Sequence, residues 1–260
     1  MVAASVVPVR QTGGQFYVWV AAFCALLTFG SFAPTYWLQL PAGTFVGPPI
    51  LHVHGILFTA WTLLLLLQTL LAANGQIGNH RAWGLAAISL ATAMVAVGLA
   101  AAIGTVAIAQ AAGFGAQARA FFIVPVSALG LFAGFFIAAI VSIVRRRPEA
   151  HKRFMMLATF ALLAPVTARI FFLVATGGGG PGLRPGLGRP LPVAAGLLPA
   201  VAVLLLIAVI VVYEWRTRGR PHPVWLIGAA TMAAVYVGRI PLSTTPGWQA
   251  IAEALTHIAG

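Results

Sequence analysis

The chain has 260 residues, of which 61% are hydrophobic and only 7% are charged. A soluble domain carries about 25% charged residues, so this composition excludes an ordinary soluble protein. Apolar runs of about 20 residues recur along the chain, which is the length that a hydrocarbon core of about 30 Å requires. The formal net charge of +12 does not indicate nucleic-acid binding here, because the basic residues gather at the ends of these runs. That placement is typical of membrane topology and of contact with anionic lipids.

Seven apolar runs predict an all-α polytopic membrane protein with about seven transmembrane helices. Their approximate ranges are 16–38, 49–73, 80–108, 119–144, 152–176, 193–213 and 224–242. Pro165 should kink the fifth span, because proline removes a backbone hydrogen bond from a helix interior. The glycine-rich segment 177–192 is predicted to be a flexible loop.

The chain is predicted to divide into three parts. Residues 1–15 form a cytoplasmic tail, 16–243 form a single seven-helix transmembrane domain, and 244–260 form an extracytoplasmic interfacial segment. In the last part, four apolar residues recur at helical spacing: Trp248, Ile251, Leu255 and Ile258.

Lys and Arg are distributed unequally between the two predicted faces of the membrane. With seven spans, ten of the fifteen basic residues fall on the side of the N-terminal tail. They are Arg10, Arg81, Arg145, Arg146, Arg147, Lys152, Arg153, Arg216, Arg218 and Arg220. The positive-inside rule therefore predicts a cytoplasmic N-terminus and an inner, or plasma, membrane location.

Histidine is the main residue available for chemistry in a chain that has no Asp, only Glu149, Glu214 and Glu253, and the single cysteine Cys24. There is no Cys-x-x-Cys-His sequence, which excludes covalent attachment of c-type haem. The third and fifth spans both open with a histidine that a basic residue follows, at His80 and His151. On the predicted topology these two imidazoles lie at the same depth, on helices that run in the same direction. Neutral imidazoles from two helices suit the axial positions of a b-type haem.

Other polar side chains inside the spans are few. His54, Trp61 and Gln68 recur every seven residues and should give the second span a polar stripe that faces other helices. Trp61 and Gln68 are interpreted as packing and interhelical hydrogen-bonding residues. His52 and His54 should point to nearly opposite sides of one helix, so they should not share a metal.

Three arginines lie near the predicted outer ends of the spans, at Arg119, Arg169 and Arg239. Such arginines commonly extend to lipid headgroups. The alternative interpretation is a cationic site for haem propionates, a quinone oxygen or an anionic substrate, with Arg169 and Arg239 as the candidate cofactor-binding residues.

The run from His54 to Trp61, followed by His80-Arg81 at the next helix start and by Arg147 and His151 later, resembles the ascorbate-type transmembrane cytochrome b family. The resemblance covers about residues 50–170. It implies a four-helix bundle formed by spans two to five, with two haems held by histidines of alternate helices. It also implies that His80 and His151 ligate the iron of one haem and that His54 is a ligand of an outer haem. The fourth span offers no second histidine for that outer haem.

The resulting hypothesis is a membrane b-type haem protein, and if it is an enzyme, an oxidoreductase. It would transfer electrons with a quinone or a small reductant as partner. Two alternatives stay open: a non-enzymatic accessory, assembly or carrier protein without a cofactor, and a metal-dependent membrane enzyme built on histidines. The oligomeric state is not indicated by the sequence.

Overall fold

The structure, a computed structural model, describes residues 12–175, 177 and 189–257. Within these ranges the chain is helical and has no strand. The α-helices are α1 (Thr12–Phe32), α2 (Ile50–Ala73), α3 (Ile77–Ala111), α4 (Gly115–Val144), α5 (Pro148–Ala161), α6 (Ala164–Ala175), α7 (Leu197–Arg218), α8 (Pro223–Leu242) and α9 (Pro246–His257). A π-helical turn, η1 (Ala33–Trp37), extends α1, and a 3-10 turn, η2 (Val193–Gly196), precedes α7. The tail with Arg10, most of the glycine-rich loop, and Ile258 lie outside the described residues.

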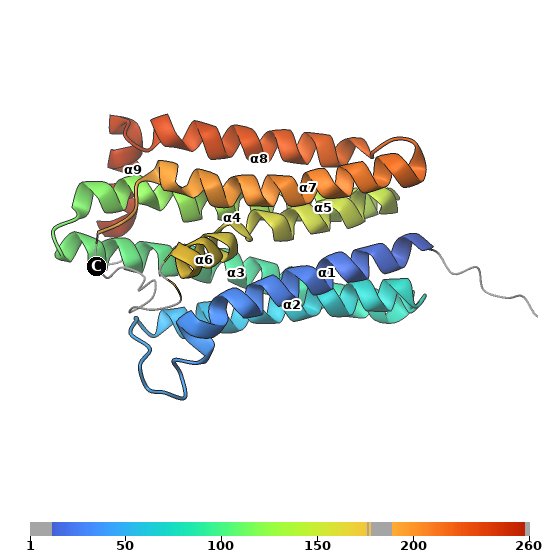
Figure 1. Cartoon of the computed structure of the whole chain (residues 1–260), viewed down its shortest axis with the longest axis horizontal. Coiled ribbons are helices and arrows are strands. Elements are labelled where there is room, and N and C mark those ends of the chain that lie inside the picture. The colour runs from blue at the N-terminus through green and yellow to red at the C-terminus, as the bar shows by residue number, and fades with distance from the viewer. Residues whose placement is uncertain (1–11, 176, 178–188, 258–260) are drawn as a thin grey trace, which may run out of the picture.

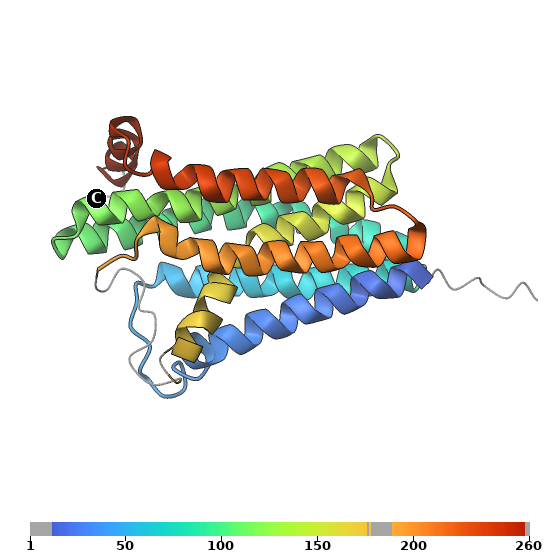
Figure 2. The same ribbon diagram turned by 45° about the horizontal axis from the view of Figure 1, so that its top comes forward.

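The long helices lie side by side along one axis, and their connections gather at two ends of the bundle (Figure 1). Helices α3, α5 and α8 begin at one of these ends, which carries His80 and His151 and is called the histidine end. The opposite end, where α4 and α7 begin, is called the arginine end, because it carries Arg119 and Arg239. The short helix α9 crosses the arginine end instead of following the bundle axis (Figure 2).

Six helices in the described part of the chain are long and apolar enough to cross a membrane. The pair α5 and α6 would add a seventh span, but it is bent by 42° at residues 162–163. The predicted kink near Pro165 is thus confirmed as a complete break between two helices. Pro165 has no N–H to donate, and its ring would clash with the carbonyl four residues earlier in a continuous helix.

Most predicted helix boundaries agree with the structure to within a turn, with one consequential exception. The sixth span was predicted to end at residue 213, which left Glu214 in a loop. In the structure α7 continues to Arg218, and Glu214 is a helical residue with 1% of its surface exposed. This corrects the predicted end of the sixth span and places Glu214 within a candidate membrane span, Val193–Arg218. Arg153 makes the burial tolerable, because an ion pair offsets the desolvation of both charges.

The hairpins α2–α3 and α4–α5 repeat the same local structure 71 residues apart (145 minus 74, and 151 minus 80). Asn74 and Arg145 end the first helix of each hairpin, and the next residues, Gly75 and Arg146, adopt the left-handed conformation with φ of 72° and 57°. Four backbone hydrogen bonds of one turn have counterparts 71 residues later in the other, among them those donated by His80 and His151. The paired His-Arg and His-Lys helix starts in the sequence therefore correspond to one repeated turn, which brings both histidines to the histidine end.

A network of charges joins four helices at the histidine end. The guanidinium of Arg153 is 1% exposed and donates to Glu214 from Nη2 at 2.5 Å and from Nε at 3.0 Å. Its Nη1 donates to a carboxylate oxygen of Glu149 at 2.7 Å. Glu214 also accepts from the Tyr17 hydroxyl at 3.3 Å and from the His222 backbone N–H at 3.0 Å. The network therefore fixes the start of α5 relative to α1, α7 and the α7–α8 turn.

The interior between the ends is packed with aromatic and aliphatic side chains. Trp61 of α2 lies edge-on to Phe132 of α4, with ring centres 5.0 Å apart, and its indole N–H donates to Thr159 of α5 at 3.2 Å. This is the interhelical bonding predicted for Trp61. Near the arginine end, Trp248 of α9 donates to the Arg119 carbonyl at 2.8 Å, which holds α9 against α4. Of the residues predicted to form the apolar face of this segment, Ile251 is exposed.

Candidate functional site

The histidine end brings together the two histidines that the sequence singled out. The imidazole rings of His80 and His151 have their centres 6.4 Å apart, and their planes are inclined by 89°. Both side chains are half-buried, and each lies in the first turn of a helix that follows a repeated hairpin turn. Two imidazoles from α3 and α5 therefore lie near each other at one end of the bundle.

Each of these rings is held by the same type of hydrogen bond. Nδ1 of His80 lies 3.3 Å from the carbonyl of Gln68, and Nδ1 of His151 lies 2.9 Å from the carbonyl of Ala139. In both cases the acceptor is 12 residues earlier, near the end of the preceding helix. Because a carbonyl can only accept, Nδ1 carries the proton, and in the neutral ring Nε2 keeps its lone pair. Histidines that bind metals are commonly oriented in this way.

Gln68 connects α2 to the start of α3 through its side chain as well as its backbone. Its amide nitrogen donates to the His80 carbonyl at 3.1 Å, which confirms its predicted interhelical bonding. Its amide oxygen Oε1 is buried and has no hydrogen-bond partner in the described part of the chain. A buried acceptor without a donor is uncommon in proteins. The Gln68 oxygen near His80 therefore lacks a hydrogen-bond donor that the described residues do not supply.

The electrostatic surroundings of this end are strongly basic. Arg81, Arg145, Arg146 and Arg147 lie on the two repeated turns and are exposed. His222 lies in the α7–α8 turn, and its ring accepts a hydrogen bond from the Val224 N–H at 3.2 Å, which caps α8. Burial, followed by the nearby charge of Arg153, lowers the pKa of His222 below its usual value. The end as a whole would attract an anionic group to its surface.

The other predicted ligand, His54, lies on α2 toward the arginine end, far from the histidine pair. Its ring stacks on Phe58 with the centres 4.0 Å apart, and its Nδ1 is buried without a partner among the described residues. The guanidinium of Arg169, another predicted site residue, lies over the Phe32 ring at 4.0 Å. His52, two residues before His54, bonds instead to the Tyr36 hydroxyl at 2.9 Å, as expected for side chains on different sides of one helix.

The predicted cofactor-binding arginines are thus separated from the histidine pair. Arg169 lies on α6, and Arg239 lies in the last turn of α8 at the arginine end. Arg119, in the first turns of α4, donates to the side-chain oxygen of Gln249 on α9 at 3.0 Å. The residues named from the sequence therefore form two groups at opposite ends of the bundle.

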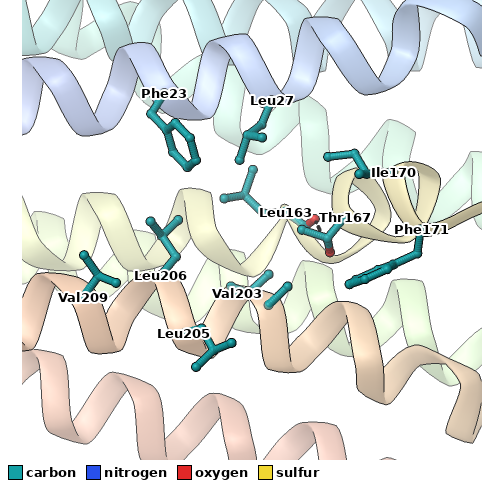
Figure 3. A pocket seen from close by; sticks show the side chains of 11 residues that line it. Phe23, Leu27, Leu163, Thr167, Ile170, Phe171, Val203, Leu205, Leu206 and Val209 are labelled. Atoms are coloured by element: carbon teal, nitrogen blue, oxygen red, sulfur yellow. Dashed lines mark hydrogen bonds between the residues drawn. The ribbon is translucent and has the colours of Figure 1, made fainter. Parts of the chain in front are cut away.

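An apolar groove of about 350 Å³ opens between α1, α6 and α7. Figure 3 shows its lining, in which Phe23 and Leu27 face Leu206 and Phe171. Its polar side chain, Thr167, donates to the Pro199 carbonyl at 3.0 Å and is not available to a ligand. The groove offers shape and apolar surface but no group for chemistry.

Sequence reasoning did not identify the charge network of Glu149, Arg153 and Glu214, or the pairing of Tyr236 with Arg239. The small number of glutamates could have indicated this network, because two of the three glutamates in the chain, Glu149 and Glu214, belong to it. In the described ranges no three His, Cys, Asp or Glu side chains come close enough to hold a metal ion together. Comparison of the chain with known protein families, with curated proteins and with solved structures finds no match.

Proposed function

We propose that this protein is a membrane-bound b-type haem protein that transfers electrons, with the haem held between His80 and His151. The observation that carries the proposal is the 6.4 Å separation of the two imidazole centres. A bond between imidazole and a first-row metal is about 2 Å long, so two imidazoles on opposite sides of one metal have centres roughly 6 to 6.5 Å apart.

The donor set fits a haem better than it fits an isolated metal ion. The hydrogen bonds from Nδ1 to the carbonyls of Gln68 and Ala139 leave one lone pair on each ring and fix its orientation. A catalytic zinc site made only of histidines needs three of them, whereas a haem needs only two axial ligands. When bound, the haem iron would supply a one-electron redox centre.

The residues of the chain have separable tasks in this proposal. His80 and His151 would hold the haem iron. Gln68 holds the start of α3 through its bond to the His80 carbonyl, and the ion pair of Arg153 with Glu214 holds the start of α5. The exposed arginines of the two turns, Arg81 among them, match the negative charge of haem propionates. Spans two to five would form the four-helix bundle around the cofactor.

The basic residues also determine the proposed orientation. Their excess at the histidine end supports a cytoplasmic position for this end and for the N-terminus, with the protein in an inner membrane. Half-burial of both histidines would let a quinone or a small reductant approach the haem edge. The arrangement of seven spans, with α5 and α6 as one broken span, completes the topology.

The test is the absorption spectrum of the detergent-purified protein, oxidised and then reduced with dithionite. The wild type should show a Soret band that shifts on reduction. His80→Ala and His151→Ala should each lose this band or change its position, because the iron would then lose one of its two imidazole ligands. His52→Ala is the matched control, since that ring bonds to Tyr36 near the other end of α2. A wild type without haem, or full retention of the band in both variants, would refute the proposal.

A further inference from the structure

The most unusual side chain away from the histidine pair is Arg239 in the last turn of α8. It is 3% exposed, and its Nε, Nη1 and Nη2 all lack hydrogen-bond partners among the described residues. Tyr236, one turn earlier on the same face of α8, is 1% exposed, and its hydroxyl also has no partner there. A buried guanidinium without any acceptor is strongly destabilising, so this site is incomplete as the described chain forms it.

The described part of the chain has no carboxylate placed to neutralise Arg239. Glu149 and Glu214 belong to the network at the histidine end, and the third glutamate, Glu253, is exposed on α9. The Tyr236 ring lies 5.0 Å from the guanidinium carbon, which gives a cation–π contact. That contact supplies no hydrogen-bond acceptor, so it cannot satisfy the five N–H groups of the guanidinium.

The guanidinium points at the start of another helix, where the local potential is also positive. Gly196 is the N-cap residue of α7, and a Cβ atom there would lie only 2.8 Å from Nη2 of Arg239. The N-terminus of a helix carries a partial positive charge that favours anions. Ala194 and Ala195, just before Gly196, are exposed, so the site lies directly beneath the surface of the arginine end.

We propose that Arg239, Tyr236 and the start of α7 form a binding site for one oxyanion group, a phosphate or a carboxylate. Its oxygens would accept from the guanidinium and from the Tyr236 hydroxyl, and its charge would neutralise Arg239. The group belongs either to an anionic phospholipid or to a small soluble anion. Sixteen residues of α8 separate Arg239 from the helix start at Pro223, about 24 Å along the axis, so the site is separate from the proposed haem.

The test measures thermal unfolding of the purified, delipidated protein in a neutral detergent at fixed ionic strength. Inorganic phosphate is titrated in one arm, and phosphatidylglycerol in mixed micelles in the other, with phosphatidylcholine as the uncharged reference. The wild type should be stabilised by at least one of the two anions. A response to phosphate alone would assign the site to a soluble oxyanion, whereas a response to phosphatidylglycerol alone would assign it to a lipid headgroup.

Arg239→Gln should weaken the response at least tenfold, and without anion it should be no less stable than the wild type, because it removes an unneutralised buried charge. Arg119→Gln is the matched control at the same end, since its guanidinium is already bonded to Gln249, and it should respond like the wild type. Tyr236→Phe keeps the ring and should weaken the response about tenfold, which provides a test if Arg239→Gln does not fold. A wild type that ignores both anions, or equal responses of Arg239→Gln and Arg119→Gln, would overturn the proposal.

Discussion

Replacement of Glu214 by Ala should destabilise the protein more than almost any other change of one polar side chain. The carboxylate accepts from Nε and Nη2 of Arg153, from the Tyr17 hydroxyl and from the His222 N–H. Its removal leaves a guanidinium that is 1% exposed with Glu149 as its remaining carboxylate partner. It also leaves the Tyr17 hydroxyl without its acceptor.

Removal of one partner from a buried ion pair typically reduces the free energy of unfolding by about 3 to 5 kcal/mol. For a chain of this size, that loss corresponds to a decrease in Tm on the order of 10 °C. Arg218→Ala is the matched control, because this arginine pairs with Glu149 at 3.2 Å on the exposed side of the same network. An exposed pair contributes about 1 kcal/mol or less, so the control should unfold close to the wild-type temperature.

The assay is thermal unfolding in detergent, followed by circular dichroism and by loss of the monodisperse peak in size-exclusion chromatography. The double variant Arg153→Met, Glu214→Leu should recover most of the lost stability, because it removes both buried charges and keeps apolar volume. If the single variant loses no more stability than Arg218→Ala, or if the double variant is as unstable as the sum of both single changes, the interpretation of a coupled buried pair is wrong.

Two further predictions concern α8. Gly228→Ala should destabilise the protein by about 1 to 3 kcal/mol, because its Cβ would overlap Leu157 of α5. Gly238→Ala is the control, because a Cβ at that position meets open space. Equal unfolding temperatures of the two variants would contradict the predicted overlap. The pKa of His222 is lowered in the folded protein, so the capping contribution of its ring is present above about pH 6.5 and is lost as the pH falls through the lowered pKa. His222→Asn, which can cap α8 without titrating, should flatten the dependence of Tm on pH below about pH 6.5, and an unchanged profile would exclude His222 as its source.

The membrane helices could be predicted from the sequence, because hydrophobic length alone determines whether a segment can cross a bilayer. The break near Pro165 was also predictable, since it follows from the covalent structure of proline. The end of α7 was not predictable from the sequence. Glu214 looked like the start of a polar loop, and only its tertiary partner Arg153 explains why the helix continues past it.

The candidate site was likewise predictable from the sequence only in part. The sequence by itself determined that His80 and His151 begin helices after similar turns, and hence that they share one end of the bundle. Whether their rings approach each other depends on how α3 and α5 pack, which no local pattern specifies. The structure places their centres 6.4 Å apart and leaves Arg239 buried without an acceptor in the described chain. Local sequence sets helix length and direction, whereas the distance between side chains on separate helices is set by packing, which every contacting residue determines together.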